Sequence, residues 1–259
     1  MDLQLKGKVI VVTGGARGIG ESIVRRLAEE DAIPCIIDID RHLAERLCGD
    51  LVRGGKDCFV AIADLTDHDQ CLKAIDAIMA AWKRIDGLVN NAGVNDGVGL
   101  ENGGYDRFMG SLRLNAVHYF TITQLVRSYL IDSGGAIVNI CSKVAETGQG
   151  NTSGYAAANG MRMEMTAGWA NELKPFGVRC NAVVVAECST PQYEWWLNTL
   201  PDPEERLRRI NERIPLYHRR TTPDEVADSC VFLLSGKSAS TNGELFHVDG
   251  GYVHLDRRI

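Results

Sequence analysis

The sequence lacks the features of several protein classes. Its 259 residues contain no run near the ~18 consecutive apolar residues that a membrane-spanning helix needs. The first residues do not combine a basic segment, a long apolar stretch and a cleavage site, as a secretory signal does. No basic run offsets the net charge of −6, which argues against nucleic acid as a partner. We therefore expect a cytoplasmic protein that binds neither membrane nor nucleic acid.

The cysteines also lack a recognisable pattern. None of the eight forms a CxxC pair and no group of histidines accompanies them, so we expect no metal site. Several cysteines stand inside apolar runs, where the side chain behaves as a small hydrophobe. A chain of this length buries a large core without disulfides or metals.

Short apolar runs alternate with longer amphipathic ones along the whole chain. The expected strands are 8–13, 33–38, 58–63, 86–91, 136–141, 178–184 and 244–248. The expected helices are about 19–30, 41–53, 67–83, 105–131, 153–174 and 222–235. Because the strands are continuously apolar, both faces of their sheet should be covered. The pattern predicts an α/β fold over residues 1–259, a single Rossmann-like, doubly wound parallel sheet of about seven strands with helices on both faces.

One irregular segment, at about 186–221, interrupts this alternation. It follows the sixth expected strand, at the edge of the sheet where doubly wound folds bind ligands. Two tryptophans and a tyrosine within it are unfavourable to leave exposed. We interpret it as a substrate-covering segment with short helices, and the alternative is a surface insertion.

A glycine-rich turn, TGGARGIG at 13–20, joins the first strand to the first helix. Gly14, Gly18 and Gly20 allow the backbone to approach a pyrophosphate at the helix N-terminus. Asp38 ends the second strand, where a carboxylate accepts hydrogen bonds from ribose hydroxyls and repels a 2′-phosphate. Arg17 would favour NADP, but an exposed arginine is tolerated with either cofactor, so NAD is the predicted cofactor. The alternative for Asp38 is a plain turn residue.

Several motifs, in this order, resemble the short-chain dehydrogenase/reductase family over nearly the whole chain. They are TGGARGIG, AD at 63–64, NNAG at 90–93, Asn115 within LRLNAV, Ser142 thirteen residues before Tyr155, and VDGGY at 248–252. Within that family the chain looks most like sugar dehydrogenases of the L-fucose dehydrogenase type. The stretches that suggest it are NNAGVNDGVGL (90–100), SKVAETGQGNTSGY (142–155), VVAECSTPQY (184–193) and DGGYVHLDR (249–257).

The resemblance implies an NAD-dependent oxidoreductase in which Tyr155 removes the proton of a hydroxyl, Ser142 holds its oxygen and Asn115 organises a relay water. The residues implied to bind the cofactor are Gly14, Arg17, Gly18, Ile19, Gly20, Asp38, Asp64, Leu65, Asn91, Ala92, Gly93, Tyr155 and Asn159. The family surfaces near 105–131, 153–174 and the C-terminus imply a homotetramer.

One position departs from the family. The family has lysine four residues after the tyrosine, and this chain has Asn159. An amide can donate to a ribose hydroxyl, but it carries no charge to lower the pKa of a tyrosine from ~10 by the ~1–3 units that a nearby cation gives. We therefore expect activity that is impaired or shifted to alkaline pH, and a gain at neutral pH on Asn159→Lys.

Four explanations of Asn159 stay open at this point: an engineered or sporadic loss, natural but reduced activity, compensation by another cation, or a catalytically silent NAD-binding protein. Lys143 is the nearest candidate cation, but neighbours on a strand point to opposite faces, which disfavours it.

The substrate expected from the resemblance is a sugar, with the anomeric hydroxyl of L-fucose or a related aldose such as D-arabinose or L-galactose oxidised to the lactone. Polar groups beside an apolar platform suit sugar hydroxyls. The candidates to bind it, besides Ser142, are Asp96, Gln149, Asn151, Glu187 and Trp196. Glu187 follows Ala186 where most family members have Pro-Gly, and an ordinary loop or packing role is the alternative for each residue.

Overall fold

The computed structural model describes residues 1–255. Its sheet has seven strands in the order β3-β2-β1-β4-β5-β6-β7, and every neighbouring pair is parallel. The strands are β1 Val9–Thr13, β2 Ile33–Asp38, β3 Phe59–Ile62, β4 Gly87–Asn90, β5 Ala136–Ser142, β6 Arg179–Val185 and β7 Leu245–Val248. The doubly wound α/β fold predicted from the sequence is confirmed.

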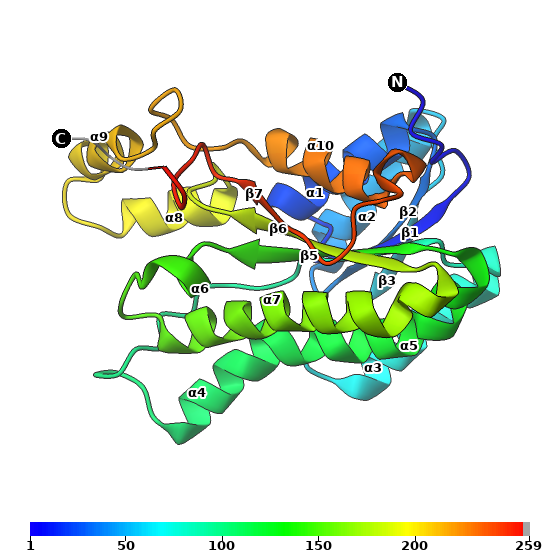
Figure 1. Cartoon of the computed structure of the whole chain (residues 1–259), viewed down its shortest axis with the longest axis horizontal. Helices are drawn as coiled ribbons and strands as arrows, with labels where there is room; N and C mark the ends of the chain where they lie inside the picture. Colours follow the sequence, from blue (N-terminus) through cyan, green and yellow to red (C-terminus); the bar gives the residue numbers. More distant parts are fainter. Residues whose placement is uncertain (256–259) are drawn as a thin grey trace.

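Helices cover both faces of this sheet (Figure 1). The helices are α1 Gly18–Glu29, α2 Arg41–Arg53, α3 His68–Trp82, α4 Tyr105–Leu112, α5 His118–Ser133, α6 Val144–Thr147, α7 Ser153–Leu173, α8 Pro191–Asn198, α9 Pro203–Glu212 and α10 Pro223–Leu234. One core cluster joins α1, α2 and α10 to the sheet, and a second joins α3, α5 and α7 to its other face. The strands are therefore covered on both sides, as their unbroken apolar runs predict.

The helix expected over residues 105–131 is divided in two. A π-helical turn, Arg113–Val117, separates α4 from α5. Such a turn interrupts the regular hydrogen-bond ladder and is frequent at functional sites. Asn115 lies in this turn, and its carbonyl accepts a hydrogen bond from Arg162 Nε at 2.5 Å. The apolar pattern gave no sign of the interruption because it continues on both sides of it.

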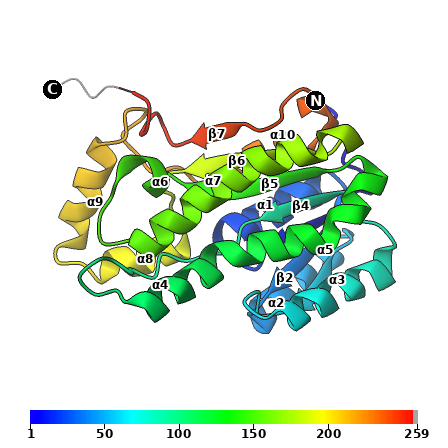
Figure 2. The same ribbon diagram turned by 60° about the horizontal axis from the view of Figure 1, so that its bottom comes forward.

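The segment after β6 leaves the sheet and returns to it at one point. A parallel bridge pairs Cys188 with Thr221, and the Thr221 amide donates to the Glu187 carbonyl at 2.9 Å. Between these residues the chain forms α8 and α9, which lie together at the carboxyl end of the strands (Figures 1 and 2). The short helices expected at 186–221 are present.

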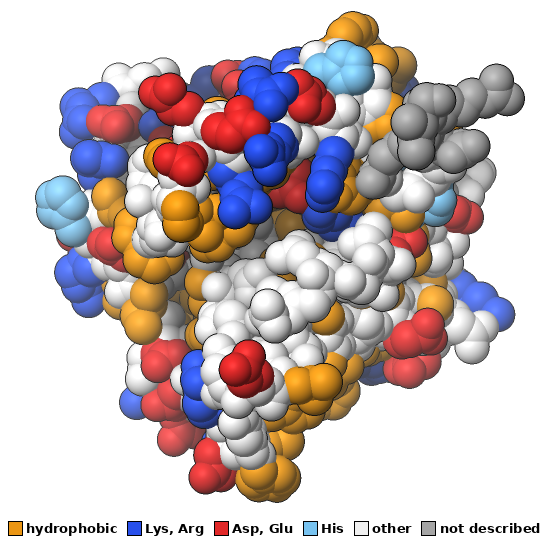
Figure 3. Space-filling view, turned by 90° about the vertical axis from the view of Figure 1, so that its left-hand side faces the viewer, with side chains coloured by type: hydrophobic (Ala, Val, Ile, Leu, Met, Phe, Trp, Pro, Cys, Tyr) orange, Lys and Arg blue, Asp and Glu red, His pale blue; other side chains and the backbone are white. Residues whose placement is uncertain are grey.

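The face at this end of the molecule carries charges of both signs. Acidic and basic side chains intermix in its upper part, and uncharged atoms dominate its centre (Figure 3). On α9, Glu205 pairs with Arg208 and Arg209 at 2.7 and 2.6 Å. Because the charges neutralise one another locally, this face presents no broad field of one sign.

None of the helices within residues 1–255 combines the length and the apolar character needed to cross a membrane. The end of the C-terminal stretch 249–257, and of the tetramer surface expected there, lies outside the described residues.

Candidate active site

The glycine-rich turn after β1 is built by close contacts that only glycine permits. Gly14 has φ +62°, and a Cβ there would lie 2.9 Å from the Cα of Ala92. A Cβ on Gly20 would lie 2.0 Å from the Gly14 carbonyl oxygen, so Gly20 shapes the turn from beneath. Asn91 donates its side-chain amide to the carbonyls of Thr13 and Gly14, both at 3.0 Å. These contacts tie the turn to the end of β4.

Asp38 ends β2 beside this turn. Its carboxylate accepts hydrogen bonds from the backbone amides of Ala16 at 2.9 Å and Asp40 at 3.0 Å, and only 9% of the residue is exposed. The two amides fix the direction of the carboxylate. Asp38 and Arg17 line the same cleft, so groups of both charges stand near the place for an adenosine ribose.

A cleft of about 350 Å³ joins the glycine turn to the ends of β4, β5 and β6. Most residues predicted for the cofactor line it. They are Gly14, Arg17, Gly18, Ile19, Asp38, Asp64, Leu65, Asn91, Ala92, Gly93 and Tyr155, and Ser142 lines it too. Gly20, Asn115 and Asn159 do not line it, although all three lie directly behind its wall. The turn is thus a cradle of the kind that a dinucleotide requires.

Asn159 connects the two residues predicted to do the chemistry. Its Oδ1 accepts from the backbone amide of Ser142 at 2.8 Å, and its Nδ2 donates to the carbonyl of Tyr155 at 2.8 Å. The side chain is fully buried. Both ends of its amide are thus engaged within the protein, and the expected contact of Asn159 with the cofactor stays a prediction. It joins the end of β5 to the first turns of α7.

Asn115 is also engaged inside the protein. Its side-chain oxygen accepts from the Val94 amide at 2.7 Å, and its carbonyl accepts from Arg162. The residue is fully buried in the π-helical turn. It holds the loop after β4 against α7, and its carbonyl is bonded to a guanidinium. The expected role of Asn115 in organising a relay water stays a prediction.

Two basic residues of the cleft, Arg162 and His118, were not predicted from the sequence. Arg162 stands seven residues after Tyr155, two turns along the same face of α7, so helical spacing offered a signal for it. His118 begins α5 just beyond the π-helical turn, which the sequence did not reveal. Burial, followed by the charge of Arg162, lowers the pKa of His118 to about 3, so its imidazole is neutral at pH 7.

Five of the residues expected to bind a sugar do not line the cleft. Glu187 forms an ion pair with Lys143 at 2.5 Å, so its carboxylate is already engaged within the protein. Asp96 accepts a hydrogen bond from the Ser111 hydroxyl at 3.0 Å, and Gln149 and Asn151 are exposed on the loop before α7. Trp196 is 39% exposed. The apolar surface at this end of the cleft comes instead from the start of α8, through Pro191 and Tyr193.

Lys143 does not face Tyr155, in keeping with its position next to Ser142 on the strand. Besides its ion pair with Glu187, its ammonium lies 3.8 Å from the ring centre of Tyr252. Burial, together with the nearby Glu187, raises the pKa of Tyr193, which lies beside this pair. This ion pair fixes the loop after β6 against the end of β5.

Three possible metal ligands also meet near the cleft. His247 Nε2 lies 2.9 Å from a Glu146 oxygen, and His254 Nε2 lies 3.3 Å from His247 Nδ1. The sequence gave no sign of this group because its members come from α6, β7 and the C-terminal turn. The three side chains form a hydrogen-bonded chain, with each partner on a different nitrogen of His247.

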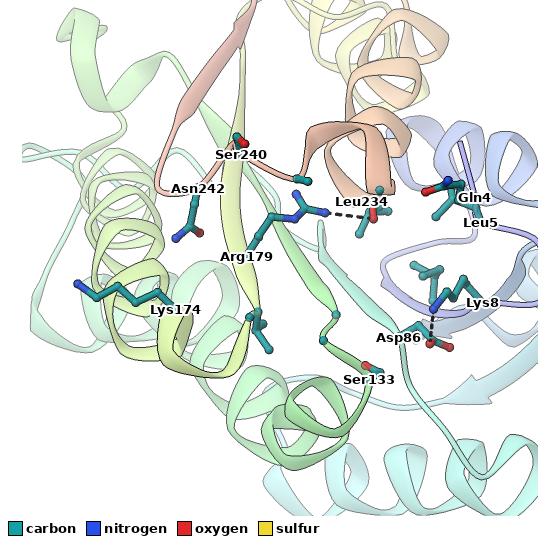
Figure 4. A pocket seen from close by; sticks show the side chains of 17 residues that line it. Gln4, Leu5, Lys8, Asp86, Ser133, Lys174, Arg179, Leu234, Ser240 and Asn242 are labelled. Atoms are coloured by element: carbon teal, nitrogen blue, oxygen red, sulfur yellow. Dashed lines mark hydrogen bonds and ion pairs between the residues drawn. The ribbon is translucent and has the colours of Figure 1, made fainter. Parts of the chain in front are cut away.

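A second hollow lies at the opposite, amino-terminal end of the strands (Figure 4). Its charged side chains serve the fold. Arg179 donates to the Leu233 and Ser235 carbonyls at the end of α10, at 2.7 and 3.0 Å, and Lys8 pairs with Asp86 at 3.3 Å. No residue of this hollow is shared with the cleft.

Known proteins match the chain along most of its length. The family model described as enoyl-(acyl carrier protein) reductase matches residues 14–253. The chain is 33% identical to the 3-oxoacyl-(acyl-carrier-protein) reductase of Thermotoga maritima, over 97% of this chain and 100% of that protein. It is 31% identical to L-fucose dehydrogenase of Bos taurus, over 100% of this chain and 94% of that protein. The chain belongs to the short-chain dehydrogenase/reductase family.

A solved structure supports the same assignment. The crystal structure of Cj0485 dehydrogenase superposes on this short-chain dehydrogenase/reductase with a TM-score of 0.94 and 39% sequence identity, covering 100% of this chain and 99% of the other. The family consists of oxidoreductases that use nicotinamide cofactors. The cleft of this short-chain dehydrogenase/reductase fits such a cofactor, because the glycine cradle and Asp38 stand at one end and Ser142 and Tyr155 at the other.

Proposed function

We propose that the protein oxidises a sugar hydroxyl with NAD, most specifically the anomeric hydroxyl of L-fucose or a related aldose, to give the lactone. The observation that carries the proposal is that Tyr155 and Ser142 line the same cleft as the glycine turn and Asp38. The likeness to L-fucose dehydrogenase of Bos taurus supports a sugar substrate. The carboxylate of Asp38 supports NAD, because it would repel a 2′-phosphate.

Each side chain has a part in this reaction. Ser142 donates to the hydroxyl oxygen of the substrate, Tyr155 takes its proton, and Asn159 holds the backbones of both residues in register. A nicotinamide held in the cleft would supply the acceptor for the hydride from the same carbon, so that the substrate would lose two electrons and two protons in total. The start of α8, at Pro191 and Tyr193, supplies an apolar wall for the sugar ring.

The neutral side chain at position 159 leaves Tyr155 without the cation four residues on. We therefore propose that turnover is lower, or rises at more alkaline pH, than in a relative with lysine at that position. The second candidate function follows from the same observation. It is a catalytically silent protein that binds NAD and acts through other partners.

The test is NADH formation with L-fucose, D-arabinose, L-galactose and a simple alcohol, between pH 7 and 10.5, with NAD and NADP compared. We expect turnover of at least one aldose with NAD and loss of turnover in Tyr155→Phe and Ser142→Ala. NAD binding without turnover at any pH would establish the silent protein instead.

A further inference from the structure

Within residues 1–255, Arg162 is a buried cation without an acidic partner. It is 2% exposed and is the largest side chain buried to that degree within residues 1–255. Its Nε donates to the Asn115 carbonyl at 2.5 Å, and its Nη1 donates to the Ile140 carbonyl and to Asn159 Oδ1, both at 3.2 Å. These acceptors are all neutral. Burying an unpaired charge is unfavourable by several kcal/mol, so folding alone gives no reason for an arginine here.

The guanidinium lies beside Tyr155 in the cleft wall. Its central carbon is 5.9 Å from the ring centre of Tyr155 and 4.3 Å from that of Tyr119. Side chains of a helix tilt toward its N-terminus, so the long arm of Arg162 reaches back past Asn159 toward Tyr155. The short amide of Asn159 leaves room for it. The guanidinium of Arg162 is thus a positive charge that comes from almost one turn further along the helix than position 159.

One donor of the guanidinium has no partner. Arg162 Nη2 is buried and makes no hydrogen bond with the described residues. A Cβ on Gly93 would lie 2.6 Å from this atom, so the glycine of the NNAG motif keeps the space in front of it open. Gly93 lines the cleft. The free donor therefore lies directly behind Gly93, in the wall of the cleft.

The other titratable groups around Tyr155 are neutral at pH 7. Burial raises the pKa of Tyr119 on α5 and raises that of Cys141 on β5 to about 12, and the pKa of His118 is lowered to about 3. Glu146 on α6 is paired with His247, and the charge of Asp64 acts on His118. Lys143 is paired with Glu187. Arg162, by contrast, has no acidic partner among the described residues and lies 5.9 Å from the ring centre of Tyr155.

We propose that Arg162 is the cation of this active site, stabilising the phenolate form of Tyr155 and donating Nη2 to an oxygen of the bound dinucleotide. The inference keeps the proposed reaction but replaces the impaired or alkaline-shifted turnover proposed for it, and only its turnover measurements rest on that reaction. It also reverses the expectation for Asn159→Lys. Asn159 Oδ1 lies 3.2 Å from Arg162 Nη1, so a lysine at 159 would bring a second cation into this buried space, where two like charges repel.

The first test uses the cofactor-free protein and needs no substrate. Ionisation of Tyr155 is followed as the ultraviolet difference between the wild type and Tyr155→Phe during a pH titration. We expect Arg162→Met to move the midpoint of this difference upward by ~1–3 pH units, because it removes the charge beside the phenol. Arg162→Lys should restore part of the shift, because it keeps the charge.

The second test measures NAD affinity by quenching of protein fluorescence, and the pH dependence of kcat and KM. Arg162→Met should weaken the binding of NAD and move the pH profile of kcat to higher pH. The double variant Asn159→Lys/Arg162→Met should recover the NAD affinity and the pH profile, because it restores a single cation. Arg179→Met is the matched control. It removes another partly buried guanidinium, one that serves the end of α10, and should leave the titration of Tyr155 unchanged.

Two results would overturn the proposal. One is a folded Arg162→Met protein whose titration and NAD affinity equal those of the wild type. The other is a ten-fold or greater gain in kcat at neutral pH from Asn159→Lys alone, for which a pKa difference of ~1 unit would suffice. If no sugar is turned over while the titration shifts as expected, the proposed function fails and the role of Arg162 stands.

Discussion

Asn159 shows how a single amide can organise the residues around it. It bonds the backbone amide of Ser142 and the carbonyl of Tyr155 at the same time, and so fixes the distance between β5 and α7 at the place where both functional side chains begin. A substitution at this position therefore affects geometry as well as charge. The loss of lysine and the gain of this connection are two effects of one residue.

Asn159→Ala should reduce both stability and turnover. It leaves the buried Ser142 amide without an acceptor, which lowers the free energy of unfolding by about 1–3 kcal/mol. Turnover should fall by more than the affinity for NAD, because the alignment of Ser142 with Tyr155 is disturbed while the glycine turn is untouched. Chemical denaturation, kcat and the NAD dissociation constant check this. A variant with normal kcat would contradict it.

Asp38→Ala should weaken NAD and relax discrimination against NADP. The change removes hydrogen bonds to a ribose and a charge that repels a 2′-phosphate. One charge-assisted hydrogen bond contributes ~1.5–3 kcal/mol, so the ratio of the two dissociation constants should change about ten-fold or more. Asp38→Asn is the matched variant, since it keeps an acceptor for the Ala16 amide while removing the charge. An unchanged ratio in both variants would mean that Asp38 does not meet the ribose.

At the scale of single elements, the sequence predicted the strands well and the π-helical turn not at all. Strands such as β1 and β2 are entirely buried, so their apolar runs are unambiguous. The turn at Arg113–Val117 is determined by contacts of Asn115 with Val94 and Arg162, far away in the chain. Local patterns carry no information on such contacts, and the same holds for the loop residues Asp96 and Glu187.

The glycine turn was predictable because its chemistry depends on residues close together in the sequence. Arg162 could have been predicted for the same reason. It shares a helix face with Tyr155 in a stretch otherwise free of charge up to Arg162. What the sequence could not show is that this arginine is buried and lacks a carboxylate partner. Those two properties come from the packing of α7 against β5 and the π-helical turn.

Asp86, just before β4, is bonded by Lys8, by the Val9 amide and by Arg84. These bonds should make part of the free energy of unfolding sensitive to acid. Burial alone would raise the pKa of Asp86, but hydrogen bonds from Arg84 and the Val9 amide and the charge of Lys8 outweigh it, so the pKa is lowered. Since the folded protein then binds the proton more weakly than the unfolded chain, the stabilisation is complete above pH ~4 and is lost as the pH falls below it.

Asp86→Asn should therefore lower the free energy of unfolding at pH 7 by about 1–3 kcal/mol, as expected for hydrogen bonds to a charged group. The difference from the wild type should shrink below pH ~4, where the carboxylate becomes protonated. Urea unfolding at several pH values measures this. Glu45→Gln on α2 is the control, because its ion pair with Arg41 is exposed and should matter little. A difference independent of pH would argue against an electrostatic origin.

At the scale of the whole molecule, we propose a homotetramer. Val117 at the end of the π-helical turn, Phe120 on α5 and Met161 on α7 are 44%, 56% and 40% exposed. Helices α5 and α7 run side by side (Figure 2). Exposed apolar side chains grouped in this way mark association surfaces. Phe120→Glu should therefore reduce the mass measured by light scattering from four times that of the monomer to a smaller value. Val52→Glu on α2 should not change it, and a monomeric wild type would refute the proposal.

The reach of Arg162 has a consequence for how such enzymes are recognised. A search that demands lysine four places after the tyrosine passes over this chain, although a positive group stands in the cleft wall beside Tyr155. A long side chain on the next helical turn can reach the same place in the structure as a side chain from the expected sequence position. Sequences dismissed as defective for want of that lysine deserve inspection three residues further on.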